Sequence, residues 1–270
     1  MEFLTILLSG LLAFVSPAGV VIDHAAENAI RSQFSKVEQL QVRVDNAPSY
    51  QIVQGKVERV RVAGRGLWLT PDVRIEALEL ETDPINLDLQ SLRQKGKKPS
   101  LKSLKQPLQA GVRVVLTEEN INQALQSPAV MARLQQLGGR IAGGSDPELL
   151  QRYQLLNPQV KFLGNNRLLF QTQLKQSGIT EPLSLTVETG LGILAGKRLD
   201  LINPTATFNG KPVPPFVVTA LKSTFSNRFD LSTLEEKGII ARLLQLKIEQ
   251  NQLEVATFVR VEPTKPSISP

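Results

Sequence analysis

The stretch from Val42 to Leu89 decides the fold, and it reads VRVDNAPSYQIVQGKVERVRVAGRGLWLTPDVRIEALELETDPINLDL. Apolar and polar residues alternate along it, which is typical of β-strands that bury one face. The alternation changes phase at Glu58, after Ala77 and at Pro84, and such changes are typical of bulges and bends. The pattern therefore predicts one long, bent hairpin with its turn in the segment Gly64–Pro71.

The length of the second arm limits how this hairpin is built. At about 3.3 Å per residue, an unbroken strand from Asp72 to Leu89 would extend roughly 59 Å, whereas a compact chain of this size has a diameter of about 48 Å. The strand therefore either breaks at Pro84 or belongs to an elongated, curved sheet. Polar side chains of opposite charge predict cross-strand ion pairs on the face in water: Lys56, Arg59, Arg61 and Arg65 on one arm, and Arg74, Glu76, Glu79, Glu81 and Asp83 on the other.

The composition excludes several kinds of chemistry. The 270 residues include no Cys, which removes disulfides, thiol nucleophiles and thiolate metal sites. The single histidine, His24, follows Asp23 after an apolar run, so we expect it at a helix start and not in a triad or metal site. The glycines between Gly190 and Lys197 lack the spacing of a phosphate-binding loop. We therefore expect no catalytic residue, no metal site and no cofactor.

The N-terminal stretch from Phe3 to Ile22 carries no charge. About 20 residues suffice to cross a bilayer core as a helix, but Pro17 interrupts this one, and the preceding residue Glu2 is not the basic n-region of a secretory signal. Three alternatives stay open for it: an uncleaved membrane anchor, an atypical signal sequence, or an apolar helix packed on the domain. Residues 1–17 form this anchor or signal-like segment.

An amphipathic helix is expected from Ala18, because its apolar residues recur at threes and fours. We expect it to lie against the apolar face of the hairpin and to form with it the lining of an apolar groove. The predicted lining residues are Ile22, Ala26, Ile30, Phe34, Val60, Val62, Ile75 and Leu80. Near the hairpin turn, Leu67, Trp68 and Leu69 either plug one end of the core or lie at a membrane interface, where Trp is favoured.

The segment 91–107 is a basic, Pro-containing linker without an acidic residue. Its cations account for the whole net charge of +6: Arg93, Lys95, Lys97, Lys98, Lys102 and Lys105. They either are solvated or attract an anionic headgroup or membrane surface, where each cation contributes about 1 kcal/mol. Nucleic acid is disfavoured as a partner, because the linker has no aromatic residue for base stacking and no recognition helix follows it.

The remaining chain alternates helices and strands. Thr117 caps a helix, and Ser127 with Pro128 starts a second segment that we expect to end at Gly138 and Gly139. Further expected features are a tight turn at Gly164–Asn166, another at Asn209–Gly210, a helix from Pro215 and a final hairpin over residues 244–261. The predicted fold class is α+β: a long, strongly curved antiparallel sheet wrapped around an amphipathic helix, with additional short helices. Residues 18–262 are expected to form a single domain that includes the basic linker, and residues 263–270 a tail.

The excess of aliphatic lining over chemical groups favours a binding protein for phospholipid or another acyl-chain lipid. The alternative is a structural or protein-interaction module whose core is filled by its own side chains. The order of elements, with Gly55, Gly64 and Gly66 in the hairpin and Asn209–Gly210 before Pro214, resembles the LmeA family. That resemblance covers residues 18–261. It implies a fold related to the tubular lipid-binding folds and a non-enzymatic phospholipid-binding protein of the bacterial cell envelope, membrane-associated on the periplasmic or lumenal face. The sequence does not specify the oligomeric state.

Overall fold

The computed structural model describes residues 22–46, 51, 54–88, 103–143, 153–176 and 181–263. The chain divides into two compact units. Unit 1 comprises residues 1–115, 231–244 and 256–270, and unit 2 comprises residues 116–230 and 245–255. Two strands of the C-terminal hairpin supply residues to both units. That residues 18–262 form a single domain stays a prediction.

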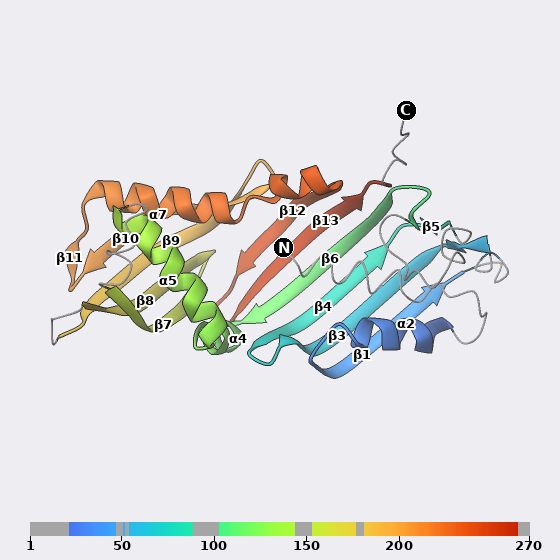
Figure 1. The fold of residues 1–270 in the computed structure, drawn as a ribbon, viewed down its shortest axis with the longest axis horizontal. Helices are drawn as coiled ribbons and strands as arrows, with labels where there is room; N and C mark the ends of the chain where they lie inside the picture. The colour runs from blue at the N-terminus through green and yellow to red at the C-terminus, as the bar shows by residue number, and fades with distance from the viewer. Residues whose placement is uncertain are drawn as a thin grey trace, which may run out of the picture. The chain divides into compact units, whose positions relative to one another are not determined.

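A six-stranded antiparallel sheet forms unit 1, and it confirms the predicted α+β class with a curved sheet (Figure 1). The order across the sheet is β1-β3-β4-β6-β13-β12. These strands are β1 (Lys36–Asp45), β3 (Arg59–Thr70), β4 (Val73–Thr82), β6 (Leu108–Thr117), β13 (Gln252–Val261) and β12 (Ile239–Ile248). A short 3₁₀ helix, η3 (Leu231–Lys237), precedes β12.

The first arm of the predicted hairpin is not one strand, and on this point the sequence prediction is wrong. The segment that contains Val42 forms β1, which folds back and pairs with β3 so that Val42 lies opposite Val62. The second arm breaks at Pro84, as one of the two alternatives required. Two short strands, β2 (Lys56–Val57) and β5 (Ile85–Asn86), then pair in a separate small sheet. The break between β2 and β3 at Glu58 and the break between β4 and β5 at Pro84 lie where the alternation changes phase.

Helix α2 (Ile22–Arg31) packs against β1. It ends earlier than the apolar spacing predicts, so Phe34 lies in the following turn and Val37 in β1. The reason is that the Ser35 N–H already donates to the Trp68 carbonyl at 2.8 Å, which commits the chain to the sheet. The helix is amphipathic: Ala26 and Ile30 are fully buried and His24 is exposed.

Unit 2 contains a five-stranded antiparallel sheet of order β11-β10-β9-β8-β7. Its elements are α4 (Glu118–Leu125), α5 (Pro128–Gly143), β7 (Tyr153–Gly164), β8 (Arg167–Gln176), β9 (Leu183–Leu194), β10 (Arg198–Phe208), β11 (Lys211–Pro212) and α7 (Pro215–Arg228). Thr117 caps α4 as predicted, with its hydroxyl accepting from the Asn120 N–H at 3.0 Å. Helix α5 continues past Gly138 and Gly139 to Gly143, so the predicted stop there is wrong.

The predicted tight turns of unit 2 are confirmed. Asn165 and Asn166 have φ values of 51° and 58°, and Asn209 and Gly210 have 46° and 75°. Two successive residues with positive φ form the turn type that suits the twist of paired strands. Because asparagine and glycine tolerate this conformation better than other residues, the sequence specified these turns locally.

Candidate functional site

An apolar wall covers one face of the unit 1 sheet. Val42, Val62, Leu80 and Val112 lie in one row across β1, β3, β4 and β6 because each is the register partner of the next. Neighbouring rows complete the wall, which we define as Leu40, Val42, Val60, Val62, Leu78, Leu80, Ala110 and Val112. Each of these side chains is at most 7% exposed, and none has a polar atom.

The structure brings part of the predicted lining together on this wall. Val60, Val62 and Leu80 belong to it, and Ala26, Ile30 and Phe34 are also buried in unit 1, at 0%, 0% and 8% exposure. Ile75 is buried too, opposite Leu67, in a row beyond those that define the wall. Of Ile22 the structure describes only the backbone, as the first residue of α2. Five residues of the wall were not among the predicted lining, although the same alternation carries them: Leu40, Val42, Leu78, Ala110 and Val112.

The opposite parity of the sheet is charged. Arg59 pairs with Glu81 at 3.0 Å and Arg113 with Glu79 at 3.1 Å, which confirms cross-strand pairing on this face. The Asp45 carboxylate accepts hydrogen bonds from Arg61 and Arg43, and mainly the bond to Arg61 lowers the pKa of Asp45 below its ordinary value. Such exposed pairs contribute only about 0 to 1 kcal/mol each. They specify register and leave the aliphatic wall as the larger stabilising feature.

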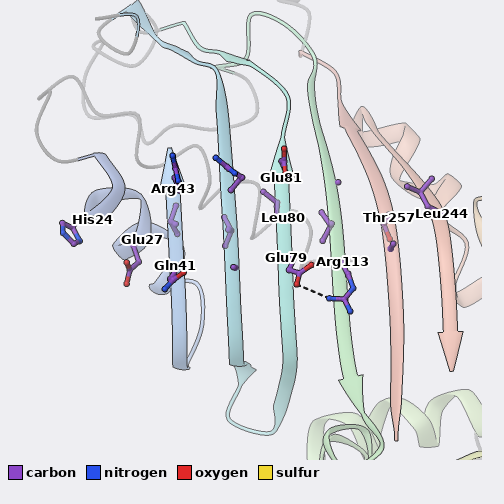
Figure 2. Close-up of a pocket in the computed structure, with 17 residues that line it drawn as sticks. His24, Glu27, Gln41, Arg43, Glu79, Leu80, Glu81, Arg113, Leu244 and Thr257 are labelled. Carbon is purple, nitrogen blue, oxygen red and sulfur yellow. Dashed lines mark hydrogen bonds and ion pairs between the residues drawn. The ribbon is translucent and has the colours of Figure 1, made fainter. Parts of the chain in front are cut away.

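A polar hollow of about 860 Å³ lies on the sheet of unit 1 (Figure 2). Residues of both parities line it, and the charged parity supplies its exposed side chains. Space comes from Gly111, where an added Cβ would meet no atom within 4 Å. Its ionisable lining consists of Arg43, Arg61 and Arg113 against Glu27, Glu79 and Glu81, with His24 at one end.

The charges of the polar hollow cancel, with three guanidinium groups against three carboxylates. Because the arginines already bind carboxylates, the hollow suits a neutral or zwitterionic polar group and has no excess charge with which to select an anion. No group of three or more metal-ligating side chains occurs in the part of the chain that the structure describes. The hollow is therefore lined by charged side chains of both signs in equal number.

Trp68 lies between two cations near the hairpin turn. The Lys36 Nζ is 4.5 Å from the centroid of the Trp68 ring, and the Arg74 Cζ is 5.0 Å from it. Trp68 and Leu69 are partly exposed, whereas Leu67 is fully buried and does not reach the surface. Of the three residues predicted at a membrane interface, only Trp68 and Leu69 therefore have side chains that reach the surface in this conformation.

The predicted basic linker falls largely outside the described residues. Lys105 alone among its six cations is described, and its Nζ lies 4.0 Å from the Asp88 carboxylate at the surface. Arg93, Lys95, Lys97, Lys98 and Lys102 lie outside the described residues, as do residues 1–21 of the N-terminal stretch. Among the helices that the structure describes, none is both long and apolar enough to span a membrane.

The glycines between Gly190 and Lys197 lie in β9 and in the turn that follows it. Gly190 and Gly192 lie inside β9, where an added Cβ would meet the Ile202 side chain at 3.2 and 3.1 Å. Both glycines thus allow β10 to approach β9 closely. The turn between these strands uses Ala195 and Gly196, with φ values of 51° and 66°.

A curved antiparallel sheet that buries one aliphatic face beside an amphipathic helix defines the class of the chain as α+β. The family comparison specifies the class further: the LmeA-like phospholipid-binding family model matches residues 14–258. The chain belongs to this family, which confirms the resemblance found in the sequence. The family is one of lipid-binding proteins and not of enzymes. No curated protein and no solved structure matches the chain.

Proposed function

We propose that this chain binds a phospholipid, or another acyl-chain lipid, with the acyl chains against the apolar wall of unit 1. The observation that carries the proposal is the register of the wall, in which Val42, Val62, Leu80 and Val112 form one unbroken aliphatic row across four strands. Membership of a phospholipid-binding family supports the same ligand class. The proposed activity is non-enzymatic, and transfer between membranes is its extension.

The energetics of such binding favour a plain aliphatic surface. A buried methylene gains about 0.8 kcal/mol relative to water, but an acyl chain that leaves a bilayer starts from an apolar environment. A binding protein therefore needs only to match the apolarity of the bilayer. A wall of Val, Leu and Ala side chains meets this requirement, because it leaves no polar group without a partner.

Location at a bacterial membrane, in the cell envelope, is part of the proposal. Partly exposed Trp68, with Lys36 and Arg74 over its ring, supports it because Trp is favoured at the headgroup level. The cations of the segment 91–107 support it through their attraction to anionic lipids. An N-terminal anchor or atypical signal within residues 1–17 would bring the chain to that location.

One observation favours the rival function, a structural or interaction module with a self-filled core. Each residue of the apolar wall is at most 7% exposed, and a core packed by its own side chains has such low exposure. The rival predicts that the protein carries no lipid when it is purified.

Native mass spectrometry of the full chain, purified without detergent, separates the two functions. The proposal expects a mass increase equal to a phospholipid, and extraction of phospholipid from liposomes by the delipidated protein. A purified protein with no bound lipid that also extracts none would overturn it. The variant Val62→Asn, which places an amide on the wall, should lower the lipid to protein ratio, whereas the neighbouring Ala63→Asn, on the exposed charged parity, should retain the lipid.

A further inference from the structure

After its first turn, the exposed residues of helix α7 in unit 2 are all polar: Thr219, Lys222, Ser223, Asn227 and Arg228. Its sequence, PFVVTALKSTFSNR, contains no acidic residue, and its only fully buried side chain is Ser226. Phe216, in its first turn, is 69% exposed, which is the highest exposure among the large apolar side chains described. A helix that covers a sheet typically presents charged or polar residues on its outer face. Phe216 departs from this pattern in the first turn of α7.

Phe216 ends a short exposed segment that we call the Pro-Phe patch: Pro212, Pro214, Pro215 and Phe216. Between these residues, Val213 is 8% exposed and packs with Val187 and Ala206 in the core of unit 2. The Val213 N–H donates to the Ala206 carbonyl at 3.1 Å, and the Val217 N–H donates to the Pro214 carbonyl at 3.0 Å. The patch is thus held rigidly at its base, and its apolar side chains project outward.

The chain segment that contains the patch carries charge of one sign. The 29 residues from 201 to 229 contain no Asp or Glu, and they carry Lys211, Lys222 and Arg228. Lys211 directly precedes the patch and is exposed, and no ion pair of Lys211 occurs among the described residues. Lys222 is paired with Asp200 at 3.3 Å. An exposed aromatic residue that follows rigid prolines and an exposed lysine combines apolar insertion with attraction to anionic lipid headgroups.

We propose that the Pro-Phe patch docks unit 2 on an anionic lipid bilayer, with Phe216 inserted at the level of the headgroups and Lys211 bound to their phosphates. The inference rests on the proposed function in one respect, that a phospholipid-binding protein must meet a bilayer to load its ligand. It adds a docking surface in a unit that does not contain the apolar wall. Neither the family match nor the predicted interface at Trp68 assigns a role to it.

Co-sedimentation with vesicles of phosphatidylglycerol and phosphatidylcholine in equal parts tests the proposal. Phe216→Ser should weaken binding by about tenfold, because apolar insertion and cation attraction act together. Lys211→Glu should weaken binding to these vesicles and leave binding to pure phosphatidylcholine unchanged. The matched control is Leu194→Ser, which removes an exposed apolar side chain of the same unit, 44% exposed, outside the acid-free run. Equal vesicle affinities for Phe216→Ser and Leu194→Ser would overturn the proposal.

Insertion depth gives a second measurement. The chain has a single tryptophan, so the double variant Trp68→Phe, Phe216→Trp reports only from the patch. Nitroxide-labelled lipid should quench its fluorescence, and absence of quenching would overturn insertion by the patch. Native mass spectrometry of the same variants distinguishes the two proposals. Bound lipid without docking by the patch overturns this inference alone, and docking without bound lipid overturns the proposed function alone.

Discussion

The side chain of Asn122 on α4 makes the backbone hydrogen bonds that a neighbouring strand would make at the edge of the unit 2 sheet. Its Nδ2 donates to the Val160 carbonyl at 2.9 Å, and its Oδ1 accepts from the Val160 N–H at 2.7 Å. Glu118, four residues before it, accepts from the Phe162 N–H at 2.7 Å, and Gln126, four residues after it, donates to the Pro158 carbonyl at 3.0 Å. Since β7 ends the order of this sheet, these side chains pair backbone groups that would otherwise be exposed at an edge.

The Asn122→Ala variant removes two hydrogen bonds and leaves both backbone groups of Val160 without their partner. Each bond contributes about 0.5 to 1.5 kcal/mol net, and Val160 is partly buried, so water replaces the lost partner only in part. We expect a loss of about 2 kcal/mol in the free energy of unfolding, which corresponds to a fall in Tm of roughly 4 to 8 °C for a chain of this size.

Urea and thermal unfolding, followed by circular dichroism, measure this loss. Gln123→Ala is the matched control, because Gln123 is exposed on the same helix and the substitution should change stability by less than about 0.5 kcal/mol. Hydrogen exchange adds a local readout, in which the Val160 amide should exchange faster in Asn122→Ala. If Asn122→Ala loses no more stability than Gln123→Ala, the pairing of the β7 edge by α4 is not a stabilising interaction.

Two further predictions concern single residues. Asp200→Asn should cost about 1 to 2 kcal/mol at neutral pH, because the Ser226 hydroxyl donates to the Asp200 carboxylate at 2.6 Å. The same bond, with a smaller effect of Lys222, lowers the pKa of Asp200 in the folded state. This stabilisation is complete above the unfolded pKa of about 4 and is lost as the pH falls through the folded pKa. Urea unfolding at a series of pH values should therefore show that the free energy of unfolding falls more steeply on acidification for the natural chain than for Asp200→Asn. Gly66→Ala should lower the free energy of unfolding by about 1 to 2 kcal/mol, because Gly66 has a φ of 57° and an added Cβ would displace the flexible Glu38 carboxylate. Thermal unfolding measures this loss, with Gly111→Ala as the control because a Cβ added at Gly111 meets no atom within 4 Å.

Features specified by a few neighbouring residues could be predicted from the sequence. The turn at Asn165–Asn166 needs only two residues that tolerate positive φ, and the cap at Thr117 needs one hydroxyl before a helix. The alternation also indicated that Val60, Val62 and Leu80 share one buried face of the sheet, and the structure shows them buried. In each case the physical cause lies within a few positions of the residue, so the local pattern contains the information.

The pairing of β1 with β3 could not be predicted from the same alternation. Val42 and Val62 have the same parity in the sequence, and this is equally expected of one long strand and of two strands that fold back with matching faces. The choice depends on the partner across the sheet and not on the segment itself. The role of Asn122 was missed for a related reason, because its hydrogen-bond partner Val160 lies 38 residues away. Glu118, Asn122 and Gln126 formed a polar stripe at a spacing of four that could have indicated it.

The distribution of charge suggests how selectivity would arise under the two proposals. The apolar wall has no polar atom with which to recognise a headgroup, and the charges that line the polar hollow cancel. An acyl chain held by aliphatic contacts alone is bound equally well whatever headgroup it carries. Discrimination between lipids would then depend on which membrane the protein reaches. The cations of the acid-free run around the Pro-Phe patch would act on the membrane surface, so preference for anionic lipid is expected in docking and not in the bound lipid itself.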